Sequence, residues 1–503
     1  MKIEDPDGAE RSFAELLARL ERFAADRTAL SELSFELRKR LLAACGRLSE
    51  PHEVDQRRLR TALRRKDRKR QRERDLAALH GAELRRTRTA GKIDDGTLPK
   101  HALPASSPAV PRAEVPAPRP TLTTPRFCYV CKEPYTSIHH FYDSMCAACG
   151  DLNFRKRTET CELTGRVALV TGGRVKIGQQ IVLKLLRCGA RVVVTTRFPV
   201  NAAERYAAMP GFDEFADRLQ IHGLDLRHTP SVEAFCRELE GSLDRLDFLI
   251  NNACQTVRRP PAFYRHMMEA ERAAAASLPE ASRALLAPSA DGARLPATIA
   301  VSGGVSAAEL SQVALEAQDL LCDRTLFPEH AFDADQQQVD LRKVNSWRLR
   351  LHEVSTPELL EVQLVNAIAP YVLNARLKGL MSREPTFDRH IVNVSAMEGQ
   401  FGRGTKTDRH PHTNMAKAAL NMMTRTSAQD YRAAGIFMNS VDTGWVTDED
   451  PAEIALRKER EGFQPPLDAI DGAARVCDPI VSGFLTGRHV SGLFLKDYAP
   501  TAW

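Results

Sequence analysis

Residues 163–178 read LTGRVALVTGGRVKIG and predict how the middle of this chain folds. The apolar run at 167–170 has the length of a buried strand, and a Thr-Gly-Gly turn follows it directly at 171–173. A segment with helical periodicity then begins at 177. Strand, glycine turn and helix N-terminus in this order present backbone N–H groups and a positive helix dipole to a pyrophosphate. One position departs from the usual G-x-x-x-G-x-G pattern, because Lys176 stands where the middle glycine is expected.

The composition indicates a large globular chain without a membrane segment. Its 503 residues predict two to four domains, and 43% apolar residues are enough for a large core. No apolar run approaches the roughly 18 residues that span a bilayer, and the start MKIEDPDGAERSF is too acidic and polar for a secretory signal. Four of the eleven cysteines form two CxxC pairs and the others are scattered, which is typical of a reducing compartment. We therefore expect a cytoplasmic protein.

Residues 1–90 predict a helical and basic N-terminal region. Apolar residues recur at helical spacing within 12–48, which indicates two amphipathic helices whose apolar faces meet each other or a partner. Residues 57–88 hold fourteen Arg or Lys against four acids, with a dense basic block at 64–70. Such a helix can bind nucleic acid, another polyanion or a protein partner, or it can be a solvated arm without a partner. Both interpretations stay open.

The next two segments predict a linker and a small metal module. The stretch at 91–126 is rich in Pro, Ala and Thr and predicts a semi-extended linker without a core. Residues 127–160 contain the two CxxC pairs, fourteen residues apart, which can close four thiolates around a tetrahedral Zn²⁺. We expect a structural ion, because four protein ligands leave no open position for catalysis. The predicted ligands are Cys128, Cys131, Cys146 and Cys149.

From 161 to the end, the pattern predicts an α/β domain of the Rossmann type. Short apolar strands alternate with helical segments, as expected for a doubly wound parallel sheet that is covered by helices on both faces. An insertion at about 261–355 interrupts this alternation with Ala-rich helical sequence, a Gly/Ser loop and an acidic stretch. The strands are expected at 167–170, 191–196, 219–223, 246–250, 391–394 and 436–441.

Several motifs of this domain occur in a fixed order. They are Thr171-Gly172 with Ile177-Gly178, Asp225-Leu226, Asn251-Asn252-Ala253, Asn366, the strand IVNVSA, Lys417 in HTNMAKAAL, and Thr443-Gly444-Trp445-Val446. With these motifs, residues 163–503 resemble the short-chain dehydrogenase/reductase family. The resemblance implies oxidation or reduction of a small-molecule alcohol or carbonyl with a nicotinamide cofactor at the carboxyl ends of the strands. It also implies a homo-oligomer that pairs through the helices around Asn366 and Lys417.

The charges near the predicted cofactor site favour NADP(H) over NAD(H). A carboxylate at the end of the second strand would bind the ribose 2′-OH of NAD and repel a 2′-phosphate, but this strand ends in Arg197. Arg174 and Lys176 add two cations, and a guanidinium matches a phosphate well. An ordinary exposed loop arginine at 197 is the alternative. The residues expected to bind the cofactor are Thr171, Gly172, Arg174, Lys176, Ile177, Gly178, Arg197, Asp225, Leu226, Asn252, Ala253, Lys417, Gly444 and Val446.

The residues expected to carry the chemistry depart from the family pattern. The resemblance implies a tyrosine four residues before Lys417 as proton donor or acceptor, but that residue is Thr413. A threonine hydroxyl cannot replace it, because its pKa lies far above the value of about 10 for a phenol. The serine that the resemblance implies falls on Ala396, with Ser395 one residue early, whereas the helix asparagine is present as Asn366.

Three explanations remain for this departure. His410 or His412 could supply the proton, since histidine is well matched to neutral pH. The domain could instead bind NADP(H) without turnover, as a regulatory or scaffold protein. A shifted alignment is the third, although the nearest tyrosine before Lys417 is Tyr371. We predict an NADP(H)-dependent oxidoreductase acting on an unidentified carbonyl or alcohol, with the non-catalytic binder as the alternative. The predicted catalytic residues are Lys417, Asn366, Ser395 and His412.

Overall fold

The computed structural model describes residues 6–90, 119–272, 278–287, 305–320, 324–333, 335–402, 404 and 406–503. The chain divides into two compact units, Met1–Arg74 and Asp75–Trp503. Most of the predicted linker 91–126 lies outside the described residues. Its end differs from the prediction, because Thr121–Phe127 form strand β1 of the cysteine module.

The first unit is helical, as the periodicity predicted. Helix α2 (Phe35–Ser49) begins after Ser34, whose hydroxyl accepts the backbone N–H of Leu37. The apolar faces of α1 and α2 remain largely open to solvent, with Phe13 65% and Phe35 66% exposed. The unit consists of α1 (Pro6–Ala25), η1 (Arg27–Glu32), α2 and the first part of the basic helix α3 (Glu53–His80).

An eight-stranded sheet forms the centre of the second unit and has the order β10-β9-β8-β7-β6-β3-β4-β5. All neighbours are parallel except the antiparallel pair β9 and β10, so the predicted doubly wound sheet is confirmed. The strands are β3 (Val167–Thr171), β4 (Arg191–Thr196), β5 (Leu219–Gly223), β6 (Phe248–Asn251), β7 (Arg389–Ser395), β8 (Ile436–Asp442), β9 (Phe494–Lys496) and β10 (Ala499–Thr501).

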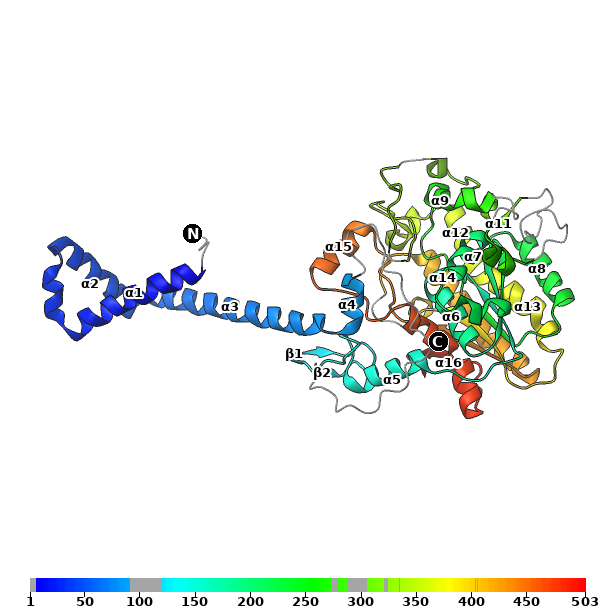
Figure 1. The fold of residues 1–503 in the computed structure, drawn as a ribbon, viewed down its shortest axis with the longest axis horizontal. Helices are drawn as coiled ribbons and strands as arrows, with labels where there is room; N and C mark the ends of the chain where they lie inside the picture. Colours follow the sequence, from blue (N-terminus) through cyan, green and yellow to red (C-terminus); the bar gives the residue numbers. More distant parts are fainter. Residues whose placement is uncertain are drawn as a thin grey trace. The chain divides into compact units, whose positions relative to one another are not determined.

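Helices cover both faces of this sheet (Figure 1). Successive strand side chains point to opposite faces, so Ala168 and Val170 enter one core and Val167 and Leu169 the other. The first face carries α6 (Lys176–Arg187), α7 (Pro199–Ala207) and α16 (Ala469–Thr486), and the second carries α8 (Thr229–Ser242), α13 (Ala369–Met381) and α14 (Pro411–Ala433).

The insertion and the remaining connections form short helices. In the insertion, four aromatic and methionine side chains of α9 are buried in a small core of their own with Phe198 and Phe327. These elements are α9 (Pro261–Arg272), α10 (Glu280–Leu285), α11 (Ala307–Leu310), α12 (Thr356–Gln363), the π-helical turn η8 (Leu364–Ile368) and α15 (Ala452–Arg460). Short 3₁₀ turns lie at η2 (Phe212–Glu214), η3 (Ala216–Arg218), η5 (Ala317–Leu320), η6 (Ser346–Arg348), η7 (Leu351–Glu353) and η9 (Met397–Gly399).

The cysteine module packs against the sheet domain. It consists of β1 paired antiparallel with β2 (Pro134–Ser137), followed by α5 (Ala147–Thr158), and helix α4 (Glu83–Ala90) precedes it. Arg157 of α5 makes a bidentate ion pair with Asp468 at 2.6 and 2.9 Å, directly before α16. The module therefore has a fixed position on the α16 side of the domain. None of the described helices is long and apolar enough to cross a membrane.

Candidate active site

The glycine turn after β3 forms the floor of a cleft at the carboxyl ends of the strands. Gly172 has φ 69°, and a Cβ on Gly178 would lie 2.1 Å from the carbonyl oxygen of Gly172. Only glycine at 178 therefore lets the start of α6 approach the turn this closely. Lys176, the first residue of α6, has φ 53°, the left-handed conformation that a glycine would adopt without strain. The turn has the predicted geometry in spite of the lysine.

Thr171 does not reach the cleft, although we predicted that it binds the cofactor. Its side chain is 1% exposed, and its hydroxyl accepts the backbone N–H groups of Asn252 at 3.1 Å and Ala253 at 3.0 Å. The Asn252 side chain in turn donates to the carbonyl oxygen of Thr171 at 3.0 Å. Thr171 thus joins the loop after β6 to the glycine turn, and the other thirteen predicted cofactor residues line the cleft.

Three cations line the cleft where β3 and β4 end. The buried Arg174 donates to Asn201 at 2.9 Å, and burial, followed by the charge of Arg205, lowers its pKa to about 10. Arg197 donates to the hydroxyl of Tyr264 at 2.7 Å. Within the described part of the chain, no carboxylate forms an ion pair with Arg174 or Arg197, whereas the charges of Glu449, Asp335 and Asp333 act on Lys176 and raise its pKa in spite of burial. A phosphate group bound at this end of the cleft could accept hydrogen bonds from the two arginines.

Asp225 lines the same end of the cleft but has a partner of its own. Its carboxylate accepts the backbone N–H of Arg227 at 2.9 Å and its Nη2 at 2.6 Å. Burial acts to raise the pKa of Asp225, but the bonds and charge of Arg227 bring it below the usual range. Arg227 is held from its other side by Glu361 at 2.7 Å. Arg227 therefore compensates the negative charge of Asp225, and this charge does not oppose the binding of an anion in the cleft.

Lys417 and Ser395 lie together at the end of β7. The ammonium of Lys417 donates to the carbonyl oxygen of Val394 at 2.7 Å. Ser395 lines the cleft, and its buried hydroxyl has no hydrogen-bond partner among the described residues. A buried hydroxyl without a partner, on a residue beside a cleft, is suited to bind a polar ligand atom. The structure thus joins two of the predicted catalytic residues.

The other two predicted catalytic residues lie outside the cleft wall. His412 is 2% exposed, and its Nε2 lies 3.3 Å from the carboxylate of Glu358 on α12. The side chain of Asn366 bonds the backbone of Gln255, accepting its N–H at 2.8 Å and donating to its carbonyl at 3.2 Å. Asn366 therefore positions the loop after β6 from the π-helical turn. His412 does not line the cleft, because its ring packs against Glu358 of α12, so the structure does not bring it beside Lys417 and Ser395 as we expected.

His410 lies in the cleft wall, whereas Thr413 does not. His410 lines the cleft, stacks on Trp347 with ring centroids 3.9 Å apart, and has φ 41°. Burial lowers the pKa of His410 below the usual value. Thr413 is 3% exposed, is absent from the cleft wall, and its hydroxyl has no partner among the described residues. The position four residues before Lys417 thus faces the protein interior here.

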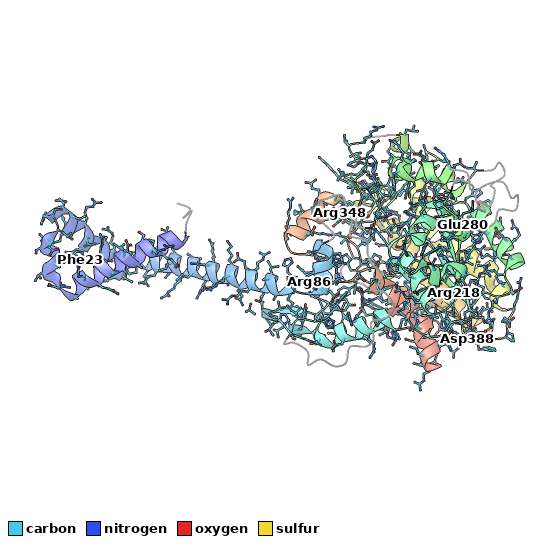
Figure 2. The ribbon with its side chains drawn as sticks, in the orientation of Figure 1. Phe23, Arg86, Arg218, Glu280, Arg348 and Asp388 are labelled. Atoms are coloured by element: carbon cyan, nitrogen blue, oxygen red, sulfur yellow. The ribbon has the colours of Figure 1, made fainter. Side chains whose placement is uncertain are left out.

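The insertion and the loop before α15 form the opposite wall of the cleft. Asn345 donates to the carbonyl oxygen of Glu449 at 2.9 Å, and Arg348, labelled in Figure 2, pairs with Asp450 at 3.4 Å. The volume between the walls is about 2330 Å³, larger than the roughly 1,000 Å³ upper range of single-ligand pockets. Arg258 is not available to a substrate, because it is buried in a bidentate ion pair with Asp319 at 2.7 Å.

The sequence did not indicate that the cysteine module contributes to the cleft. Tyr129, between the first two cysteines, lines the cleft, and its hydroxyl oxygen accepts the backbone N–H of Trp445 at 2.9 Å. Lys496 of β9 lies over the Tyr129 ring, with its Nζ 5.5 Å from the ring centroid. The only sequence signal was the aromatic residue inside a CxxC pair.

The four predicted metal ligands lie together. The Sγ atoms of Cys128, Cys131, Cys146 and Cys149 all lie within 4.8 Å of one another. Cys131 and Cys146 are 3.8 Å apart, about the S–S separation that tetrahedral Zn–S bonds of ~2.3 Å produce. Among the described residues, this is the one cluster of His, Cys, Asp and Glu that could hold a metal ion.

A dinucleotide-type turn, an open cleft at the strand ends, and a lysine and serine at its floor define the class of NAD(P)-dependent oxidoreductases. Comparison with known proteins agrees. Residues 166–273 match the family model described as short chain dehydrogenase. An uncharacterized protein of Acanthamoeba polyphaga mimivirus is 33% identical over 374 residues, covering 71% of this chain and 72% of the viral protein. Residues 166–273 therefore carry a short-chain dehydrogenase domain, and 71% of the chain is related to the viral protein.

Relatives with named activities match a smaller part of the chain. Retinol dehydrogenase 14 of Mus musculus is 38% identical over 98 residues, 18% of this chain and 29% of that enzyme. A probable oxidoreductase of Streptomyces antibioticus is 42% identical over 88 residues, 17% of this chain and 28% of that protein. Among solved structures, the RhlG/NADP complex of Pseudomonas aeruginosa is 17% identical, with a TM-score of 0.42 over 67% of this chain and 95% of that chain.

Proposed function

We propose that this protein is an NADP(H)-dependent oxidoreductase that interconverts a carbonyl compound and an alcohol. It is an atypical family member, because the usual tyrosine position holds the buried Thr413. The observation that carries the cofactor preference is the pair of cleft arginines at the ends of β3 and β4, Arg174 and Arg197, for which the described residues provide no ion pair with a carboxylate. A 2′-phosphate would supply the anion that this pair lacks.

The residues present fit a nicotinamide dinucleotide. The start of α6 approaches the glycine turn closely, as only a glycine at 178 permits, and a helix N-terminus in this position suits a pyrophosphate. Ser395 offers an unsatisfied hydroxyl at the other end of the cleft, beside the ammonium of Lys417. When bound, the cofactor supplies or accepts a hydride. The roles that remain for the chain are to orient the substrate oxygen through Ser395 and to hold positive charge beside it through Lys417.

Titration of NADPH and NADH by their fluorescence tests the cofactor choice. We expect Arg197→Gln to weaken NADPH binding about 10- to 100-fold, since charge-assisted bonds contribute about 1.5–3 kcal/mol, and to leave NADH binding unchanged. Arg191→Gln is the matched control, because Arg191 lies at the opposite end of β4 and is exposed. Equal affinity of the wild type for both cofactors would refute the preference, and no binding of either would refute the function.

The non-catalytic NADP(H) binder predicts a different outcome. It requires NADPH binding but no oxidation of NADPH with any member of a broad carbonyl panel.

The cysteine module is proposed to hold one structural Zn²⁺. Four thiolates at tetrahedral spacing favour zinc among the common biological metals, and they leave no position for a reacting ligand. Burial raises the pKa of the Cys146 and Cys149 thiols, whereas for Cys128 several backbone N–H groups outweigh burial and bring the pKa below its usual value. Such donors stabilise the thiolate that binds a metal.

The basic helix α3 is proposed to bind a polyanion. Its arginines and lysines are largely exposed, and the ion pair between Arg57 and Glu53 leaves both side chains at least 80% exposed. A gel-shift titration with duplex DNA and with RNA at 50 and 200 mM salt tests this proposal. We expect affinity to fall at least tenfold over that range, and a salt-independent affinity would refute an electrostatic contact.

A further inference from the structure

We propose that Tyr264, on helix α9 of the insertion, is a positioning residue that holds Arg197 in place for the 2′-phosphate of the cofactor. The insertion then contributes to the selectivity between NADPH and NADH, although it lies outside the alternating strands and helices of the sheet fold. The proposal rests on the NADP(H)-dependent function proposed above and adds the residue that orients one of its phosphate-binding arginines.

Tyr264 contacts Arg197 through both its hydroxyl and its ring. The guanidinium donates from Nη2 to the hydroxyl oxygen of Tyr264 at 2.7 Å, and its Cζ atom lies 4.7 Å from the centroid of the same ring. A hydrogen bond combined with a cation–π contact restricts the rotamers of a long side chain. The hydrogen bond uses one of the five N–H donors of the guanidinium, so the arginine keeps donors for a phosphate.

Two aromatic rings support Arg197 together with the neighbouring Arg174. Phe198 packs against Tyr264 with ring centroids 5.0 Å apart, and the Cζ atoms of Arg197 and Arg174 lie 5.5 and 5.6 Å from the centroid of the Phe198 ring. Tyr264 is 7% exposed and Phe198 2%, and both belong to the small core of the insertion. The guanidinium groups are therefore held before a ligand binds, which lowers the entropic cost of binding.

The insertion also contacts Arg174 directly. Arg174 donates from Nη1 to the Sδ atom of Met267 at 3.5 Å and from Nη2 to the side-chain oxygen of Gln337 at 3.4 Å. Met267 lies one helical turn after Tyr264 on α9. Both partners are uncharged, so they orient the guanidinium without neutralising its charge, whereas a carboxylate in their place would repel a phosphate.

The Tyr264 hydroxyl lies in a positively charged environment. Burial acts to raise the pKa of Tyr264, but the charge and the hydrogen bond of Arg197, followed by the charges of Arg259 and Arg174, bring this pKa below its usual value. The same positive charges favour an anionic group of a ligand at this end of the cleft. The environment of the hydroxyl thus agrees with the contacts of the two arginines.

The first test titrates NADPH and NADH by their fluorescence into the wild type and into Tyr264→Phe. The substitution keeps the buried ring and removes only the hydroxyl, so the core of the insertion stays packed. We expect the affinity for NADPH to fall at least ~10-fold, because a hydrogen bond to a charged group is lost, and the affinity for NADH to stay within about twofold. An unchanged affinity for NADPH, or an equal loss for both cofactors, would overturn the proposal.

Tyr431→Phe is the matched control for this test. Tyr431 is a buried phenol of α14 that donates to the backbone carbonyl oxygen of Asn374 at 2.9 Å, and it does not line the cleft. We expect Tyr431→Phe to bind both cofactors as the wild type does. A loss of NADPH affinity in Tyr431→Phe as large as that in Tyr264→Phe would show that any buried phenol has this effect, and would overturn the specific role of Tyr264.

A second test determines whether Tyr264 acts through Arg197. Calorimetric titration with adenosine 2′-monophosphate presents the phosphate without the nicotinamide half, and adenosine 5′-monophosphate is the reference ligand. We expect Tyr264→Phe and Arg197→Gln each to weaken binding of the 2′-monophosphate, and the double variant to bind it about as weakly as Arg197→Gln alone. Fully additive losses would overturn the positioning role, because each residue would then act independently.

The proposal and the function on which it rests fail in different ways. If the wild type prefers NADPH and Tyr264→Phe keeps that preference, Tyr264 has no part in selectivity and the proposed function stands. If the wild type binds neither cofactor, the proposed function is refuted. Equal affinity of the wild type for NADPH and NADH would refute the cofactor preference, and with it the selectivity that Tyr264 is proposed to support.

Discussion

The ammonium of Lys417 donates to the carbonyl oxygen of Val394 at 2.7 Å, and this bond fixes the lysine at the end of β7. A lysine ammonium has three donors, so two remain for ligands in the cleft.

Replacing Lys417 by methionine should therefore abolish most of the activity. We expect Lys417→Met to lower kcat/KM at least ~100-fold, because it removes the positive charge beside the substrate oxygen while keeping most of the side-chain volume. Steady-state oxidation of NADPH with the best carbonyl substrate measures this. Lys406→Met is the control, since Lys406 is exposed at the rim of the same cleft. A wild-type rate in Lys417→Met would contradict the assignment.

Restoring the family tyrosine at Thr413 should fail. The side chain of Thr413 is 3% exposed and points into packed protein, so a phenol there overfills the core. We expect Thr413→Tyr to lower the free energy of unfolding by about 1–3 kcal/mol and to leave kcat unchanged or reduced. Thr413→Ser is the control for loss of the methyl group. A gain in kcat with Thr413→Tyr would show that the proton site is at the family position after all.

Because Lys176 has a left-handed backbone conformation, we expect Lys176→Gly to raise the stability and to lower the affinity for NADPH. Lys176→Gly should stabilise the fold by about 1 kcal/mol, because glycine adopts φ 53° without strain. It should also weaken NADPH binding several-fold, since an ammonium near the phosphates is lost. Thermal unfolding and NADPH fluorescence measure the two effects. Lys176→Ala separates them, as it removes the charge but keeps the strain, and a variant with unchanged affinity would exclude Lys176 from the site.

Metal analysis tests the cysteine module. We expect about one zinc per chain, retained in Cys45→Ser and lost in Cys149→Ser, because only the latter removes a member of the four-cysteine cluster. Since the module packs against α16, loss of the metal should also lower the unfolding temperature of the second unit. Wild-type protein purified without chelator that carries no metal would contradict the proposal.

Much of the fold was predictable because it depends on local periodicity. The strands at 191–196 and 219–223 have the predicted bounds, and the cleft residues follow from the rule that strand ends meet at one edge. The site was less predictable because it depends on which way a side chain faces. His412 and His410 are two residues apart on one turn, yet the first packs against Glu358 and the second lines the cleft. The sequence contained no sign of that rotation.

Tyr129 illustrates a second limit of the sequence. It lies more than 280 residues before Lys417, in a segment whose two CxxC pairs already had a complete explanation as a metal module. Its position in the cleft wall does not follow from any residue near Lys417 along the chain. Its contact with Trp445 depends on how the module docks on α16, which is determined by tertiary ion pairs rather than by any periodic pattern.

His222 in β5 predicts a pH dependence of stability. The ring is 3% exposed, its nitrogens have no hydrogen-bond partners among the described residues, and Glu238 lies 3.7 Å from Nδ1. Burial and then the charge of Arg191 lower its pKa to about 4, whereas a histidine in the unfolded chain has a pKa of ~6.5. The unfolded chain therefore binds the proton more tightly. The stability is complete above about pH 6.5 and is lost as the pH falls towards 4.

At pH 5 this difference corresponds to about 2 kcal/mol of the free energy of unfolding. Replacing His222 by phenylalanine keeps a ring against Phe235, which His222 contacts edge-to-face with centroids 5.2 Å apart. We expect His222→Phe to flatten the decline of the unfolding free energy between pH 7 and 5, measured by urea unfolding at several pH values. His80→Phe, at an exposed site on α3, should leave the slope unchanged. An equal decline in wild type and His222→Phe would mean that the buried ring does not resist protonation, and that other groups cause the acid sensitivity.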